Sequence, residues 1–453
     1  MRKKVHEQLP LLPARIRHER AHEYAEVSDI LDELPELLDL IDADVRRGAR
    51  ADTGRPGLSA EQVQRGLIVK QSEGFSYEQL AFHVLDSSTY RWFCRIGLAD
   101  DPPAATTWQE NIKRLDPQTI EAHHRAVLEL AKEEGLEDGR TVRGDCTVVE
   151  TNVHHPTDSS LLWDCVRVLT RLMAQAYDAG APLAFSDHTR RARRRNLGIS
   201  NARGAKTRRR LYQDLLKVTS NTVGYAERAV PRIHRWWPAD GDIERGFAVS
   251  AIGEALRRYV ALARRVIEQT TRRVISGEAV PVADKLFSIF EPHTDLIMKG
   301  SRSPEFGHKV FLSGGRSGLV LDCIPLTGNP ADATLVEQFL HRHVEVFGEI
   351  PAETAFDGGF VSKANVALLK DAGVVNAAFH KKRGVAVADM VRSTWAFRQL
   401  TRFRAGIEGS ISWLKRCFGW TRCLWRGFDS FKTYVWSSVV TANLFVFARH
   451  RLA

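Results

Sequence analysis

Three acidic residues stand at positions where carboxylates could hold metal ions. Asp145 lies in the middle of a predicted strand, Asp357 follows a second predicted strand, and Glu408 lies in residues 404–410, which we expect to open a helix. Phosphoryl transfer by two divalent cations needs a few carboxylates that hold the ions roughly 4 Å apart, so that one ion activates the attacking oxygen and the other stabilises the leaving oxygen. Hard carboxylate oxygens suit Mg²⁺. The three acids therefore predict a catalytic metal site.

Each of these acids has a simpler explanation when it is taken alone. Asp357 precedes a glycine and could belong to a turn, and Glu408 could supply the acidic first turn of a helix. Asp145 could pair with Arg143 or Arg140. The metal-site hypothesis therefore rests on the combination of the three acids.

Two further sets of side chains are weaker ligand candidates. Glu150 is five residues beyond Asp145, so alternation places it on the opposite face of a regular strand. The pairs His154–His155 and His341–His343 lack the usual spacing of zinc ligands. The sequence therefore favours magnesium over zinc.

The elements that would position the acids alternate between strands and helices. Residues 141–152 are rich in β-branched side chains, which favour a strand. The later segments predict strands at 309–312, 319–324, 353–356 and 374–379, with helices at 331–347 and 362–372. This order predicts a mixed sheet with helices packed on it, an α/β fold.

The first 138 residues have the pattern of short helices. Ser59 and Ser76 each begin a helix with capping chemistry, and Pro117 starts another. The tight turn in residues 71–76 is compatible with a helix-turn-helix, whose second helix can enter the major groove of DNA. Simple helical bundles have the same features, so this indication is weak.

A basic tract interrupts a second helical region, residues 159–278. Its density of arginines offers many groups that could neutralise phosphates, although a solvated helix face is the alternative. We favour contact with the DNA backbone, and the candidate residues are Arg193, Arg194, Arg195, Arg208, Arg209 and Arg210.

The composition of the chain supports a polyanionic partner. The 453 residues carry 65 Lys and Arg against 55 Asp and Glu, a formal charge of +10. An arginine-rich genome would give the same balance, so charge alone does not identify the partner. The most apolar stretch, residues 435–448, is short of the ~20 residues that span a bilayer, and we expect it to be a buried terminal helix. The N-terminus lacks a signal peptide, and we expect a cytoplasmic protein without a membrane anchor.

Several segments together resemble the bacterial insertion-sequence transposases of the DDE type, most closely the ISNCY-type group, which are built on an RNase H-like domain. These segments are Arg143–Asn152 with Pro156–Leu162, Glu305–Val310, Gly328–Ala333, Phe356–Phe360 and Arg404–Gly409. They extend over most of residues 140 to 420.

The resemblance implies that Asp145, Asp357 and Glu408 are the catalytic, metal-binding acids. It also implies DNA-binding roles for Arg404 and Lys415, which have the R-x3-E-x6-K spacing of related transposases. On a helix these three positions share one face, so they could all reach the same phosphate. Related proteins have a tyrosine where this chain has Thr401, so the resemblance does not extend to an aromatic contact to DNA at that position.

The resemblance and the element pattern together predict the domain organisation and the activity. We expect a helical DNA-binding domain (1–138) that recognises the ends of the mobile element, an RNase H-like catalytic domain (139–158 and 279–453) and a helical basic insertion (159–278). The expected activity is cleavage and strand transfer of double-stranded DNA by a homodimer with two Mg²⁺ ions, for which Mn²⁺ could substitute. The rival functions are a nuclease without strand transfer and a DNA-binding regulator with an idle site.

Overall fold

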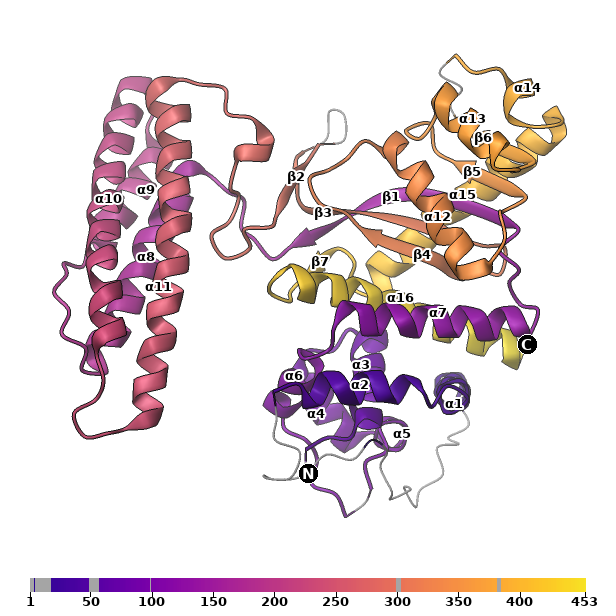
Figure 1. Ribbon diagram of the computed structural model, residues 1–453, viewed down its shortest axis with the longest axis horizontal. Helices are drawn as coiled ribbons and strands as arrows, with labels where there is room; N and C mark the ends of the chain where they lie inside the picture. The colour runs from indigo at the N-terminus through magenta and orange to yellow at the C-terminus, as the bar shows by residue number, and fades with distance from the viewer. Residues whose placement is uncertain (1–3, 5–17, 49–56, 98, 299–302, 381–383) are drawn as a thin grey trace. The chain divides into compact units, whose positions relative to one another are not determined.

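The computed structural model describes residue 4 and residues 18–48, 57–97, 99–298, 303–380 and 384–453 (Figure 1). The chain divides into two compact units. The first unit consists of residues 1–152 and 307–453, and the second unit consists of residues 153–306.

The N-terminal part of the first unit is helical, as the sequence predicts. Ser59 and Ser76 each form a complete capping box at a helix start, and Pro117 is the first residue of its helix. These local signals gave correct helix starts because the cap satisfies backbone N–H groups within the same turn. The helices are α1 (Glu19–Asp32), α2 (Leu37–Arg46), α3 (Ala60–Glu73), α4 (Tyr77–Asp86), α5 (Ser88–Phe93), α6 (Ala105–Ile112) and α7 (Pro117–Glu133).

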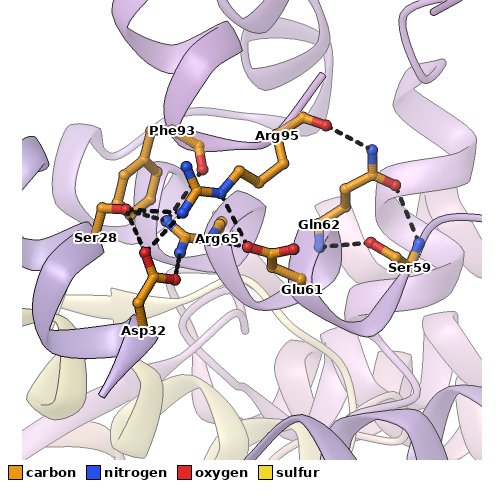
Figure 2. Close-up of polar contacts among 8 residues, drawn as sticks. All are labelled: Ser28, Asp32, Ser59, Glu61, Gln62, Arg65, Phe93 and Arg95. Atoms are coloured by element: carbon orange, nitrogen blue, oxygen red, sulfur yellow. Dashed lines mark hydrogen bonds and ion pairs between the residues drawn. The ribbon is translucent and has the colours of Figure 1, made fainter. Parts of the chain in front are cut away.

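A network of two arginines and two carboxylates joins α1 and α3 to the residues after α5 (Figure 2). The Arg65 guanidinium on α3 contacts Asp32 of α1 at 2.6 Å and Glu61 at 3.1 Å. Arg95, which follows α5, contacts the same two carboxylates at 2.8 Å and 3.0 Å. Since each cation has two anionic partners, the charges are compensated although Arg65 is almost completely buried. The network makes this region a rigid scaffold.

The sheet of the first unit combines antiparallel and parallel strands. Strands β4, β3 and β1 are antiparallel neighbours, and β5 and β6 continue from β1 in parallel, while the short β7 pairs with another part of β1. The predicted mixed sheet is therefore confirmed. The strands are β1 (Thr141–Thr151), β3 (Glu305–Gly314), β4 (Val320–Pro325), β5 (Glu353–Phe356), β6 (Asn376–Phe379) and β7 (Arg422–Cys423).

Helices cover both faces of this sheet (Figure 1). Helix α12 (Val336–Phe347) packs through Phe339 against Phe311 of β3 and Phe356 of β5. Gly144 of β1 makes room for these rings, because a Cβ there would lie 2.7 Å from the Phe356 ring. The long helix α15 (Thr394–Cys417) contacts β1, β5 and β6 from the opposite face. The next residue of β1, Asp145, therefore points toward α15.

Three other α-helices and a 3₁₀ turn (Asp332–Leu335) complete the described part of the first unit. Short helices α13 (Lys363–Asp371) and α14 (Val387–Met390) contact β6. The C-terminal helix α16 (Phe428–Leu452) packs against α7, α1 and α3, and its residues 433–445 are all buried. The prediction of a buried terminal helix is thus confirmed. No helix in the described ranges is both long and apolar enough to cross a bilayer.

The second unit is a bundle of helices with its own apolar core. Helices α8, α10 and α11 contact one another extensively, and α9 packs against α8 and α10. The predicted helical stretch after the first strand lies in this unit. Its elements are α8 (Asp158–Asp178), α9 (Thr189–Asn201), α10 (Ala205–Arg235), α11 (Ile243–Thr270), a π-helical turn (Thr271–Ser276), a 3₁₀ turn (Val282–Asp284) and strand β2 (Asp295–Ile297).

Charge is divided unequally between the units. The second unit contains 26 Lys and Arg against 16 Asp and Glu, which is the whole net charge of +10. The first unit contains 39 of each sign and has no net charge. Within the first unit, residues 1–138 are acidic, with 18 Lys and Arg against 26 Asp and Glu. The electrostatic attraction for a polyanion is therefore concentrated in residues 153–306.

Candidate active site

The strand register brings the first two acids to the same level of two neighbouring strands. Gly144 of β1 is aligned with Phe356 of β5 in a parallel pair. Asp145 and Asp357 each follow directly after one of these residues, and neighbouring strands are about 4.8 Å apart. Two carboxylates that are 212 residues apart in the sequence therefore lie side by side, one on β1 and one directly after β5.

The third acid lies on α15, but not where the sequence indicated. Glu408 was expected at the opening of a helix; the structure shows that this is wrong, because α15 begins at Thr394 with Ser393 as its N-cap. Glu408 is thus in the middle of the helix, one turn after Arg404. The helix continues through the glycines at 406 and 409.

Arg404 is the centre around which the three acids gather. Its Nη2 lies 2.6 Å from Glu408 Oε1, and its Nη1 lies 3.5 Å from Asp145 Oδ2 and 3.9 Å from Asp357 Oδ1. Asp145 Oδ1 also accepts a hydrogen bond from the backbone N–H of Cys146 at 2.7 Å. The Arg404 side chain is nearly buried, whereas those of Asp357 and Glu408 are 41% and 62% exposed. The site therefore presents carboxylates to solvent over a buried cation.

Arg143 supports the helix that carries Arg404, a role that sequence reasoning missed. Its Nη1 donates to the Phe403 carbonyl at 3.1 Å, and its guanidinium lies 4.7 Å from the centre of the Phe403 ring. Burial lowers the pKa of Arg143. Gly406 leaves room for this side chain, since a Cβ there would lie 1.8 Å from Arg143 Nη1. The i, i+2 spacing of Arg143 and Asp145 on one strand face was the only signal in the sequence.

A second supporting pair lies beside the loop that follows β5. Lys309 of β3 donates to the Pro330 carbonyl at 2.6 Å and to Asp332 Oδ1 at 2.9 Å. Asp332 in turn fills the space beside Gly359, where a Cβ would lie 2.5 Å from Asp332 Oδ2. Because Gly359 is two residues after Asp357, this pair restricts the loop that positions the second acid. Nothing in the local sequence pattern indicated it.

The donor chemistry of the site suits a divalent cation, although no cation site is preformed. Among the described residues, no three or more His, Cys, Asp or Glu lie close enough to hold a metal ion. The acids instead surround the Arg404 guanidinium. Carboxylate oxygens are the ligands that Mg²⁺ prefers, and the exposed side chains of Asp357 and Glu408 have room to reorient toward an ion. The residues therefore fit a metal ion in type.

The other predicted residues are distributed over both units. Lys415 lies on α15 eleven residues after Arg404, about three turns along the same helix. Glu150, the weaker candidate, bonds through Oε2 to Arg422 of β7 at 2.6 Å, so it is held outside the cluster around Arg404. The six basic candidates lie on α9 and α10 in the second unit, and all except Arg195 are exposed. Arg195 is half-buried and pairs with Asp214.

Comparison with known proteins gives two family matches. Residues 15–114 match the family described as "Transposase domain (DUF772)", and residues 299–444 match the "Transposase DDE domain" family. The second match includes Asp357 and Glu408, whereas Asp145 lies outside both matches and is joined to the site by β1 and Arg404. No curated protein and no solved structure is significantly similar to the chain.

Proposed function

The chain carries a transposase DDE domain and is therefore a DNA transposase, and we propose that Asp145, Asp357 and Glu408 are its catalytic carboxylates. The observation that carries this proposal is the convergence of the three acids on Arg404 from two strands and a helix. DDE transposases as a family use divalent metal ions. We propose that this chain uses Mg²⁺, most simply as two ions, with Mn²⁺ as a substitute.

When bound, the ions would activate an attacking oxygen and stabilise the leaving oxygen of a phosphodiester. Asp145 would provide the fixed ligand, since one of its oxygens is already held by the Cys146 N–H. Asp357 and Glu408, which are exposed, would turn toward the ions. Arg404 would then exchange its carboxylate contacts for the substrate phosphate, which a guanidinium can bind through two N–H groups. Lys415 on the same helix would contact the adjoining backbone.

The proposed catalytic domain is RNase H-like and consists of residues 139–158 and 279–453. Its element order supports this proposal: three antiparallel strands are followed by two parallel strands, with helices on both faces of the sheet. Residues 159–278 are the proposed basic insertion, and residues 1–138 the proposed N-terminal domain. The proposed subgroup is the ISNCY type.

The exposed arginines of the second unit are the proposed DNA-backbone contacts. Transposases bind DNA, and the second unit holds the entire net positive charge of the chain. Long-range attraction of this kind accelerates association with DNA and weakens with salt. The proposed backbone contacts are Arg193, Arg194, Arg195, Arg208, Arg209 and Arg210.

Strand transfer and a homodimer complete the proposal. The 3′-hydroxyl released by cleavage would attack target DNA at the same carboxylate site, so no covalent protein intermediate is needed. Two element ends must be held together for joining, which two copies of the chain would accomplish.

The test is a divalent-ion titration of DNA cleavage on substrates that carry the flanking ends of the gene's own locus. We expect nicking that depends on Mg²⁺ or Mn²⁺, and joined products when target plasmid is present. The Asp357→Asn variant should bind DNA but not cleave it. Glu150→Gln is the matched control, because it removes a carboxylate from the same sheet that is held by Arg422.

The outcomes separate the rival functions. Nicking without joined products would indicate a nuclease without strand transfer. Tight binding without cleavage under any divalent ion would indicate an idle site. Loss of cleavage in Glu150→Gln with full activity in Asp357→Asn would replace Asp357 by Glu150 as the ligand.

A further inference from the structure

Helix α4 presents a solvent-facing surface that the proposed function does not use. Phe82 and Leu85 are 59% and 52% exposed, and they lie three residues apart on the helix. Glu78 is one turn before Phe82, and Asp86 is one turn after it. Positions three and four apart share one helix face, so these four side chains form a single apolar and acidic surface, the α4 face.

The α4 face belongs to a well-formed helix rather than to a frayed segment. Ser76 caps α4 with a complete capping box, and Leu80 and Val84 on its other side are fully buried. The preceding turn uses Gly74 in the left-handed conformation to end α3, and α3 is fixed by the arginine–carboxylate network (Figure 2). Phe82 and Leu85 are therefore exposed on a helix whose position is fixed by its cap and its buried face.

The composition of the α4 face does not suit DNA. Recognition helices approach phosphates with cations and read base edges largely with hydrogen-bond donors. Glu78 and Asp86 would be repelled by phosphate, and Gln79 is the one exposed amide donor on this helix. The surrounding residues 1–138 carry a net charge of −8. An apolar centre with an acidic rim instead suits a protein surface that is apolar and basic.

Helix α9 in the second unit has this complementary composition. Leu197 is 53% exposed, although most of the helix is arginine-rich and polar. Arg193 and Arg194 lie four and three residues before Leu197, and Arg190 lies seven before it, all of them exposed. These residues form one helix face with an apolar centre and a basic rim, the α9 face.

We propose that the α4 face of one copy binds the α9 face of a second copy when no DNA is bound. Phe82 and Leu85 would pack on Leu197, while Glu78 and Asp86 would approach the arginines around it. The two faces lie in regions of opposite charge, −8 for residues 1–138 and +10 for residues 153–306, so they are electrostatically complementary at contact. Since Arg193 and Arg194 are also proposed DNA contacts, DNA would compete with the α4 face.

The experiment is a charge exchange between the two faces in the full-length protein. One variant carries Glu78→Lys and Asp86→Lys, and the other carries Arg193→Glu and Arg194→Glu. All four positions are on the surface, and circular dichroism checks that both variants are folded. Sedimentation velocity at low ionic strength, without DNA, measures association of each protein alone and of the two variants mixed.

We expect wild-type protein to associate in a concentration-dependent way. Each variant alone should associate at least about tenfold more weakly, because its α4 face and its α9 face then carry charge of the same sign. Mixing the two variants should restore association, since a basic α4 face then meets an acidic α9 face. Double-stranded DNA should dissociate the wild-type assembly.

The proposal is overturned if wild-type protein stays monomeric, if either variant associates as wild type does, or if the mixture fails to restore association. A monomer in every condition would indicate another occupant of the α4 face. Cleavage by the Glu78→Lys, Asp86→Lys variant is measured in parallel. Its activity should remain, so that failure of this inference and failure of the proposed catalytic function are distinguishable.

Discussion

The two units differ in how they use charge. In residues 153–306 the excess of ten positive charges is spread over helix faces on which most of the described arginines are exposed. In the other unit positive and negative charges balance, and those at the candidate site converge on a buried arginine. The first arrangement favours attraction without precise geometry, whereas the second favours precise geometry without net attraction.

The two units also differ in how they are assembled. Helices α8 to α11 follow one another in the chain and pack as neighbours. The candidate site instead joins Asp145 to Arg404 across 259 residues of sequence. If chemistry belongs to one unit and electrostatic attraction to the other, variants should affect these two properties separately.

The largest expected effect follows from Asp357→Asn. Loss of a metal ligand should reduce cleavage by on the order of 10³-fold or more, while DNA affinity changes little because the basic surface is intact. Single-turnover cleavage and a DNA-binding titration measure the two properties on the same protein. An equal loss of binding and cleavage would break the proposed division between the units.

Low pH should destabilise the first unit selectively. Burial lowers the pKa of His123 and His343 to about 4, below the ~6.5 of an unfolded histidine. Between these values the unfolded chain binds more protons, so the stabilisation is complete above pH 6.5 and is lost as the pH falls toward 4. At pH 5 each of these two histidines should lower the free energy of unfolding by about 2 kcal/mol relative to its value above pH 6.5. The described histidines of the second unit are all at least partly exposed.

Urea unfolding followed by pulse proteolysis and mass spectrometry reports each unit within the full-length chain. We expect peptides of the first unit to become cleavable at lower urea at pH 5 than at pH 7, with little change in the second unit. His343→Leu should make the first unit less sensitive to pH. An equal loss of stability at pH 5 in both units would contradict the assignment of the pH dependence to the buried histidines of the first unit.

Gly406→Ala should affect activity more than stability. The added methyl group would displace Arg143 from Phe403 and shift the segment of α15 that carries Arg404, so we expect cleavage to fall roughly 10- to 100-fold. The helix preference for alanine, about 1 kcal/mol, should offset part of the packing cost. Gly409→Ala is the control on the same helix, since an added Cβ there meets nothing within 4 Å. A similar loss of cleavage in both variants would argue against a role of Arg143 in positioning α15.

The smallest expected effect is on salt dependence. Replacing Arg193, Arg194 and Arg210 by alanine should lower the slope of log affinity against log salt by about 2 to 3, if each contacts one phosphate. Cleavage by the bound complex should be unchanged. The matched control removes three exposed cations from the first unit through Lys113→Ala, Lys363→Ala and Arg426→Ala. Equal slopes for the two triple variants would show that the second unit is not the main DNA surface.

Much of the fold was predictable because its signals are local. Caps at Ser59 and Ser76 and the proline at 117 act within one helical turn, and the abundance of β-branched residues identifies β1 without knowledge of its partners. The short strands β2 and β7 were missed, since strands of two or three residues have no pattern of their own. The predicted N-terminal DNA recognition and the cytoplasmic location stay predictions.

The sequence by itself determined which acids are candidates and where the positive charge lies, because residue type and spacing depend on the chain alone. Only the tertiary structure decided that Arg404 joins the three acids and that Glu408 lies in mid-helix. Glycine is unfavourable inside a helix, yet Gly406 lies in the middle of α15. There its lack of a side chain leaves space for Arg143, which comes from a distant strand. Such a contact depends on strand register and packing, which local sequence does not encode.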